Sequence, residues 1–215
     1  MKKYIFKSTI LAAFALLTTV FTSCESDSND EKKNEIQLVE HGSKVMGWGK
    51  GGRTTDCYLG LSEGNGGIIS FLNVDKNDEA TQTRVDIVFP GDVGSSGGGL
   101  TVGAPISDGL GGAGYEYCKE WIRKNGTKIA EMPNSFDLTA FENVKTVPQI
   151  LELDKKAFYS SWQYPGTNNG GQGKTLLIKT YTGHLALMFI ERIQGSYGDT
   201  QAKVTIRLKV TPNTH

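Results

Sequence analysis

Residues 94–98, Gly-Ser-Ser-Gly-Gly, carry the G-x-S-x-G spacing of a serine nucleophile elbow. That elbow works only where a strand leads through a sharp turn into a helix, so that the serine hydroxyl is exposed. Here the segment leads into Gly99 and the strand-like LTVGAP. A serine hydrolase also needs a histidine base. His41 lies close to the N-terminal segment, His184 begins an apolar run and His215 is the last residue. We therefore expect no hydrolase chemistry.

Residues 168–175, NNGGQGKT, come close to a phosphate-binding P-loop. The motif needs a glycine where Asn168 stands. It also needs a helix after the Lys-Thr pair, so that backbone amides meet the phosphates. The following TLLIKTY has the composition of a strand. The segment is therefore predicted to be a Gly-rich hairpin loop.

Metal-ligand spacing is weak throughout the sequence. Three separated histidines, with no C-x-x-C or H-E-x-x-H pattern, leave no zinc signature. A loosely calcium-like spacing is formed by Asp75, Asn77, Glu79 and Asp86. That segment lacks the glycine of an EF-hand loop, and Asp86 falls in an expected strand. We expect a charged hairpin tip there, with no metal. We also expect no other cofactor and no enzyme activity in this chain. A glycosidase would need two carboxylates that folding brings together, and nothing in the sequence selects such a pair.

Aromatic side chains in polar, Gly-rich surroundings offer binding chemistry instead. Tyr159, Trp162 and Tyr164 lie in FYSSWQYPGTNNGGQG, and Trp48 lies between two glycines. Such rings have an apolar face that can stack on the C–H face of a sugar, while nearby Asn and Gln bond its hydroxyls. We predict Trp162 and Tyr164 as ligand contacts, with Trp48 as a second contact. The alternative is that these rings cover the ends of a β core.

Cys57 and Cys118 form an even pair of cysteines once Cys24 is set aside. In an oxidising compartment such a pair can form a disulfide, here closing a loop of about 60 residues and contributing roughly 4 kcal/mol. Both cysteines lie next to a tyrosine, and a free cysteine packs as a small hydrophobic side chain. The sequence leaves a disulfide and two buried thiols as alternatives.

Residues 1–23 have the three parts of a secretory signal peptide. Three lysines precede a short apolar run, and the small Ser23 stands directly before Cys24. The run is too short and Thr-rich for a spanning helix of about 20 apolar residues. The segment resembles a lipoprotein signal peptide, which implies cleavage before Cys24, a lipid on its thiol and attachment to a membrane. A plain secretory signal is the alternative.

Residues 24–35 are predicted to be a disordered acidic tether, because no apolar residue lies between Cys24 and Ile36. The acidic residues that follow Cys24 are Glu25, Asp27, Asp30 and Glu31. They resemble the tag that directs Bacteroidetes lipoproteins to the outside of the outer membrane. The resemblance implies a lipid-anchored protein of the outer membrane that faces the cell exterior. An ordinary solvated linker is the alternative.

Hydrophobic periodicity predicts a mainly β domain. Residues 203–210, KVTIRLKV, alternate apolar and polar side chains, as a strand with one buried face does. Residues 175–190 read as two strands broken at Thr182-Gly183, the second apolar on both faces and therefore central. Further strands are expected at 56–61, 67–72 and 84–89. A Gly-rich turn signal separates the first two of these.

Two short helices are expected at 114–126 and 147–158. Asn125-Gly126 suits the end of the first helix, and Pro148 suits the first turn of the second. Residues 36–215 are enough for one sizeable core and are assigned to a single domain. We predict a mainly β fold, an antiparallel β-sandwich or flattened barrel with one or two short helices.

The charge balance excludes one class of partner. Lys and Arg total 23, and Asp and Glu also total 23. A balanced chain lacks the basic surface that nucleic-acid binding needs. It also lacks a polybasic patch for anionic lipid, so the lipid on Cys24 is the expected link to a membrane.

Several segments resemble a recurrent type of small, uncharacterised Bacteroidetes lipoprotein domain. They are VDIVF, LTVGAP, the region from Trp121 to NGTKI with Phe136-Asp137, LLIKTYTGHLALMFIERI and VTIRLKV. The resemblance covers most of Arg84–Val210 and rests on strand patterns. It implies a β-sandwich-like fold and brings no catalytic residues.

These observations favour a non-catalytic cell-surface lipoprotein that binds an extracellular ligand, with glycan foremost. The alternative is a structural or accessory subunit that docks onto an outer-membrane protein complex. A concave aromatic face would favour the first function, and a flat apolar patch would favour the second.

Overall fold

The computed structural model describes residues 35–49, 56–61, 67–70, 74–90, 99–107, 118–166, 171–196 and 198–213. All of them belong to one compact unit, Asn34–His215. Within these ranges the chain is mainly antiparallel β, with two five-stranded sheets and three short helices. The mainly β prediction is confirmed. The expected signal peptide, the lipidation site Cys24 and all of the tether except Glu35 lie outside the described residues.

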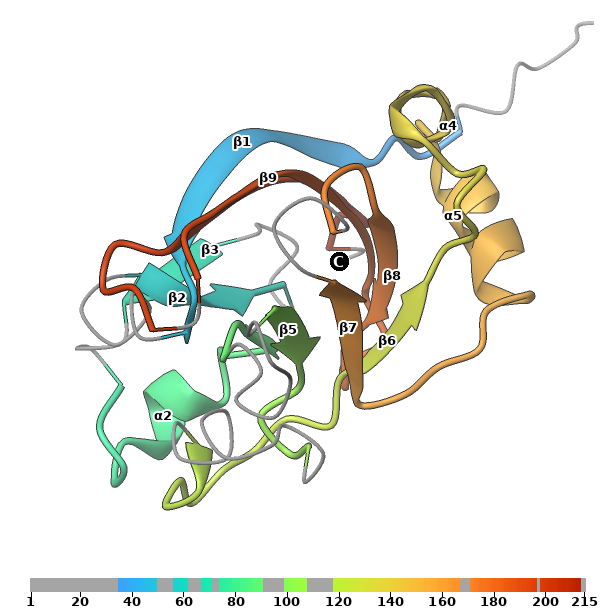
Figure 1. Ribbon diagram of the computed structural model, residues 1–215. Coiled ribbons are helices and arrows are strands. Elements are labelled where there is room, and N and C mark those ends of the chain that lie inside the picture. The colour runs from blue at the N-terminus through green and yellow to red at the C-terminus, as the bar shows by residue number, and fades with distance from the viewer. Residues whose placement is uncertain are drawn as a thin grey trace, which may run out of the picture. The chain divides into compact units, whose positions relative to one another are not determined.

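The first sheet has the strand order β1-β10-β9-β8-β6, and Figure 1 labels β1, β9, β8 and β6 of it. Its strands are β1 (Val39–Gly47), β10 (Lys203–Val210), β9 (Leu185–Gln194), β8 (Thr175–Lys179) and β6 (Lys128–Glu131). The central position predicted for the apolar strand β9 is confirmed. The edge strand β1 escapes prediction because a bulge between His41 and Lys44 inserts one extra residue against β10 and breaks the period-two pattern.

The second sheet has the strand order β3-β2-β4-β5-β7. Its strands are β3 (Gly67–Ser70), β2 (Asp56–Gly60), β4 (Ile87–Val88), β5 (Leu100–Gly103) and β7 (Trp162–Gly166). The strand expected at 84–89 shrinks to β4, because the N–H groups of Arg84 and Val85 bond the carbonyls of the preceding helical turn. The segment read as a polar aromatic loop forms the edge strand β7, which corrects that interpretation.

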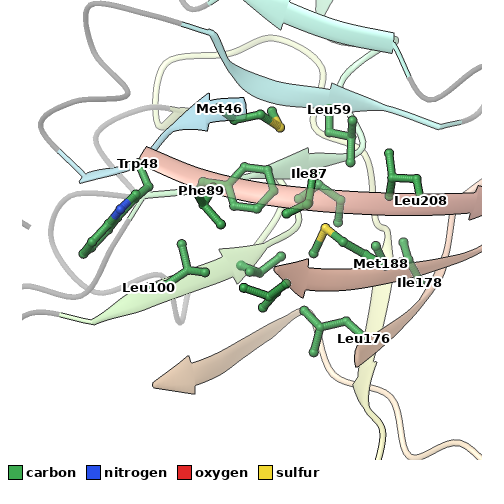
Figure 2. Packing of buried hydrophobic residues seen from close by; sticks show 14 of the residues in the cluster. Met46, Trp48, Leu59, Ile87, Phe89, Leu100, Leu176, Ile178, Met188 and Leu208 are labelled. Carbon is green, nitrogen blue, oxygen red and sulfur yellow. The ribbon is translucent and has the colours of Figure 1, made fainter. Parts of the chain in front are cut away.

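The two sheets enclose one hydrophobic core (Figure 2). The first sheet contributes residues such as Ile178, Met188 and Leu208, and the second contributes residues such as Leu59 and Leu100. Each such side chain, when fully buried, contributes roughly 1.5–3 kcal/mol. The alternation predicted for β10 places Val204, Ile206 and Leu208 in this core.

The edges of the two sheets meet where β6 lies beside β7. Ile129 of β6 and Ser160, just before β7, bond each other through both backbone pairs, at 2.8 and 2.9 Å. The Gln163 side-chain amide also donates to the Ile129 carbonyl at 3.1 Å. The fold is therefore sandwich-like, with the two sheets joined along this side.

Two helices cover the outer face of the first sheet, α4 (Leu138–Asn143) and α5 (Val147–Asp154). Figure 1 shows both beyond β8 and β9, away from β2 and β5. They enclose a second apolar cluster that includes Phe141, Ile150 and Phe189. The carboxylate of Asp137 accepts the Ala140 N–H at 2.9 Å and so caps α4.

The predicted helices are only partly confirmed. Helix α5 begins at Val147, as expected, but ends at Asp154. The helix expected over 114–126 does not extend past Cys118 in the described residues. Tertiary bonds compete with it, since the Arg123 N–H donates to the Gln82 side chain. Helix α2 (Glu79–Gln82) and α4 were not predicted. In the described part of the chain no helix is long and apolar enough to cross a membrane.

Candidate functional site

The two Gly-rich segments that come close to catalytic motifs are only partly visible. Residues 94–98, which carry the serine spacing, lie outside the described ranges, and so do residues 168–170 of the P-loop-like segment. Its Lys-Thr pair leads into strand β8, as predicted. The Lys174 ammonium pairs with Glu131 and donates to the Asn134 side chain at 2.7 Å. Lys174 therefore links the start of β8 to the end of β6 and is not offered to a phosphate.

The calcium-like segment uses its carboxylates for the backbone. Asp75 accepts the Asn77 N–H at 2.7 Å, and Asp78 accepts the Thr81 N–H at 3.1 Å and so caps α2. The expected hairpin tip is therefore a short capped helix. Asp86 is buried at β4, where its carboxylate accepts the Leu61 N–H at 2.7 Å. Among the described residues no group of three or more His, Cys, Asp or Glu side chains could hold a metal.

The histidines have structural settings. His41 lies at the β1 bulge, where burial, followed by the charge of Lys44, lowers the pKa of its imidazole. His184 lies in the turn between β8 and β9, directly before Leu185, with Nδ1 3.5 Å from the Thr211 hydroxyl. His215 lies outside the described residues.

Trp48 is a core residue, which corrects its assignment as a ligand contact. Its side chain is fully buried, and Figure 2 shows the ring at one end of the central cluster. The indole N–H donates to the Gln194 carbonyl at 3.1 Å, so the polar end of the ring is also used internally. A ligand in solvent cannot reach this ring because the chain itself covers it.

Tyr164 is half-buried on the edge strand β7, where its ring lies against a glycine. A Cβ atom added to Gly99 would lie 2.3 Å from the Tyr164 hydroxyl. The ring therefore covers backbone that has no side chain of its own. This packing leaves Tyr164 a smaller exposed face than its sequence setting suggested.

Tyr159 is also committed to the fold. Its hydroxyl donates to Asp154 at 2.6 Å, and the Lys179 ammonium donates to the other oxygen of the same carboxylate at 2.9 Å. Its ring packs against the cluster under α4 and α5. Burial, followed by the bond to Asp154, raises the pKa of the Tyr159 hydroxyl.

Trp162 is the predicted contact that remains available to a ligand. It is 40% exposed, and Phe158, four residues earlier, is 92% exposed. Along this stretch Phe158, Ser160 and Trp162 are exposed while the residues between them are half-buried. The three residues are therefore exposed within five positions of one another, on either side of a bend at Ser161. We refer to residues 158–162 as the Phe158–Trp162 segment.

The backbone of the Phe158–Trp162 segment is held from both sides. Ser160 pairs with Ile129 of β6, and the Ser161 carbonyl accepts the Ala104 N–H at 2.8 Å, just beyond β5. The Gln163 amide donates to the Ser160 hydroxyl at 3.1 Å. The exposed rings therefore stand on a fixed strand edge with polar side chains beside them, which reduces the entropy lost on binding.

The sequence pattern missed Phe158 as a surface residue because it falls inside the helix expected at 147–158. The helix ends four residues earlier, at Asp154, and releases Phe158 into solvent. The available signal was the Asp-Lys-Lys run before it, which lacks the apolar period of a longer helix.

Cys57 and Cys118 are not bridged to each other in this structure, so the disulfide alternative is not the state observed. Both are buried in one apolar cluster with Tyr58 and Trp121, whose rings lie 5.2 Å apart. A register shift between Asp56 and Tyr58 lets Cys57 and its neighbour Tyr58 join the same cluster. Burial raises the pKa of the Cys118 thiol.

Comparisons with known proteins identify a fold relative. No family model and no curated protein matches the chain. Among solved structures it is similar to a DUF4466 family protein from Parabacteroides merdae, with a TM-score of 0.57 and 16% sequence identity. The match covers 82% of this chain and 54% of that protein, so the chain spans about half of its length. At this identity the likeness shows a shared fold.

Proposed function

We propose that this chain is a non-catalytic surface lipoprotein that binds an extracellular polymer, with glycan as the favoured ligand. The observation that carries the proposal is the Phe158–Trp162 segment, whose two exposed rings stand on an anchored strand edge. Their faces can stack on the C–H faces of sugar rings. The Ser160 hydroxyl donates to the Trp162 carbonyl, and the Gln163 amide donates to Ser160 and to the Ile129 carbonyl. These two side chains hold the edge on which Trp162 stands.

The expected affinity is low for a single site. Stacking on an exposed ring contributes about 1–2 kcal/mol, so two rings support a site in the micromolar-to-millimolar range at best. A lipid anchor compensates for this weakness, because many copies held at one surface engage one polymer together. Weak single sites are therefore compatible with firm retention of a polymer.

The proposed location rests on the N-terminal sequence. The signal-like residues 1–23 and the acidic residues behind Cys24 support a lipid anchor in the outer membrane, facing the cell exterior. The fold is shared with a protein from Parabacteroides, a genus of the Bacteroidetes, which supports an origin in that group.

Affinity electrophoresis through gels that contain polysaccharides tests the binding proposal. Trp162→Ala and Phe158→Ala should lose the retardation that the parent chain shows, while their melting temperatures stay nearly unchanged. Tyr181→Ala is the matched control, since Tyr181 is a 43% exposed aromatic residue outside the segment. Equal retardation of all variants, or a large fall in the melting temperature of Trp162→Ala, would contradict the proposal.

Fractionation of cells that carry Cys24→Ser tests the anchor. The variant should be released from membranes or remain unprocessed, because the acylated thiol is gone. A processed, membrane-bound Cys24→Ser protein would show that another feature holds the chain at the membrane. Protease treatment of intact cells then separates exposure on the outer face from a location on the inner face.

A docking role is the second candidate, and two exposed aliphatic residues favour it. Ile106 is 51% exposed and Ile122 is 63% exposed. The Ile106 N–H donates to the Asn125 carbonyl at 3.4 Å, which brings the two stretches together. Branched aliphatic side chains give a sugar little to stack on, whereas a protein partner can bury them. Loss of co-purifying outer-membrane protein in Ile122→Asp, with polysaccharide retardation absent from the parent, would support docking.

A further inference from the structure

A groove with a volume of about 520 Å³ lies between α5, the turn from β8 to β9, and the residues that follow β10. Its size falls in the range of about 300–1,000 Å³ that small-molecule sites occupy. The residues that line it include no Asp, Glu, Lys or Arg. The proposed function does not use this groove, because the Phe158–Trp162 segment contributes no residue to it.

One wall of the groove is aliphatic. Val147 and Leu151 lie one turn apart on α5, and Pro212 belongs to the segment after β10. On the same helix Ile150 is fully buried in the cluster against the first sheet, whereas Leu151 is 44% exposed. The Leu151 side chain is therefore not used by the core and is exposed in the groove, where a ligand can contact it.

The other wall is polar and is held in place by its own hydrogen bonds. The buried Thr180 hydroxyl accepts the His184 N–H at 3.0 Å and lies 2.9 Å from the Thr182 hydroxyl. The Thr211 hydroxyl accepts the Leu185 N–H at 3.1 Å and lies 3.5 Å from His184 Nδ1. Gly183, with φ +92°, permits the turn that brings these groups together. The wall therefore presents hydroxyl and imidazole groups in fixed positions.

We propose that this groove binds one neutral sugar residue of pyranose size. A charged ligand would lose water without finding an opposite charge in the lining, which disfavours phosphates, uronates and amines. An uncharged ring with a C–H face and a rim of hydroxyls matches an aliphatic wall opposite a polar one. The sugar packs its C–H face on Leu151 and Val147 and turns its hydroxyls toward Thr182, His184 and Asn213.

The inference shares its ligand class with the proposed function but rests on different residues, so that either can fail alone. The Phe158–Trp162 segment would hold a polymer by stacking, and the groove would accept a single residue of it. The same sugar could reach the groove as a free monosaccharide or as a unit of an oligosaccharide. Both sources present the same chemistry to the groove.

Saturation-transfer NMR on the detergent-solubilised, full-length protein tests the inference. The probes are glucose, galactose, mannose and N-acetylglucosamine at millimolar concentration, their β-linked trisaccharides, and glucuronate as the charged comparison. Leu151→Trp fills the groove from its aliphatic wall and should lower the affinity for the neutral probe by about tenfold or more. Leu138→Trp is the matched control, since Leu138 is a 43% exposed leucine on α4 that does not line the groove.

The outcomes separate the two proposals. Signal from a neutral sugar that survives Leu138→Trp and Trp162→Ala but is lost in Leu151→Trp supports the groove. No signal from any neutral monosaccharide or trisaccharide, or equal binding of glucuronate, overturns it. A signal lost in Trp162→Ala and kept in Leu151→Trp also overturns it, while supporting the proposed function.

Discussion

The ammonium group of Lys209 lies 5.0 Å from the centre of the Phe141 ring, and the Lys209 side chain is only 1% exposed. The ammonium donates to the carbonyl oxygens of Glu142 and Val144, both at 2.9 Å, and pairs with Glu40 at 2.9 Å. These carbonyls belong to the end of α4, where the last carbonyls of a helix lack partners within it. Lys209 on β10 therefore satisfies the end of the helix that covers the sheet.

Replacing this lysine should be costly. Lys209→Met keeps most of the side-chain volume but leaves two carbonyls without their donor, and we expect the free energy of unfolding to fall by about 2–4 kcal/mol. Urea denaturation measures the change. Lys203→Met, at the exposed start of the same strand, should stay within about 0.5 kcal/mol of the parent. Equal stability of the two variants would show that the buried pairings contribute nothing net.

The two tryptophans Trp48 and Trp162 should behave in opposite ways. Trp48→Ala empties a fully buried site and should lower the free energy of unfolding by about 3–5 kcal/mol. Trp162→Ala removes a 40% exposed ring and should cost less than about 1 kcal/mol. Thermal and urea unfolding of both variants check the contrast. A large loss in Trp162→Ala would place that ring in the core and remove it from the candidate site.

Gly99 should not tolerate a side chain. A Cβ atom there would lie 2.3 Å from the Tyr164 hydroxyl and 2.8 Å from the Gly166 carbonyl oxygen. Gly99→Ala is expected to lower the free energy of unfolding by about 1–3 kcal/mol. Tyr164→Ala should recover part of that loss in a double-mutant cycle, since the backbone clash with Gly166 remains. Gly126→Ala, with no atom within 4 Å of its added Cβ, serves as the neutral control.

The bonds around Asp154 should make stability depend on acid pH. Burial alone would raise the pKa of this carboxyl, but the bonds from Lys179 and Tyr159 and the charge of Lys179 lower it overall. A pKa that is lower in the folded state adds stability above the unfolded value of about 4, and this contribution is lost as the pH falls through the folded value.

Asp154→Asn should therefore be less stable than the parent at neutral pH, and the difference should shrink below about pH 4. Tyr159→Phe removes one of the two side-chain bonds to Asp154, so its stability at neutral pH should lie between that of the parent and that of Asp154→Asn. Urea titrations across acid pH measure the three chains side by side. A difference that stays constant down to about pH 2 would contradict the assignment of the effect to this carboxylate.

The thiols of Cys57 and Cys118 should resist alkylation in the folded chain. Both are buried, and the raised pKa of Cys118 leaves little of the reactive thiolate. Iodoacetamide should label neither residue in the native protein and both after unfolding without reductant, as peptide mapping by mass spectrometry can show. Labelling that requires a reductant would reveal the disulfide instead.

Local pattern determined much of this fold. The alternation in KVTIRLKV and the apolar run from Leu185 are properties of consecutive residues. Because successive side chains of a strand point to opposite faces of the sheet, such a pattern predicts directly which face is buried. The bonds that cap α4 join residues that are neighbours in sequence. Helix α4 was nevertheless not predicted, because it is too short to show a clear apolar periodicity. The bulge in β1 was not predicted, because it depends on what the opposite strand offers. The strand expected at 84–89 is shorter than predicted, because Arg84 and Val85 bond the preceding helical turn.

The proposed location of the chain and the expectation that it carries no catalytic motif rest on sequence alone, since a signal peptide and motif spacings are linear features. The candidate site could not be predicted in this way. Trp48 and Trp162 lie in similarly polar, Gly-rich stretches, yet one is core and the other is at a strand edge. That difference arises because burial depends on which distant segments pack together, here β6 and β5 around the Phe158–Trp162 segment. The groove beside α5 likewise exists only because α5, the β8–β9 turn and the end of β10 meet in the folded chain.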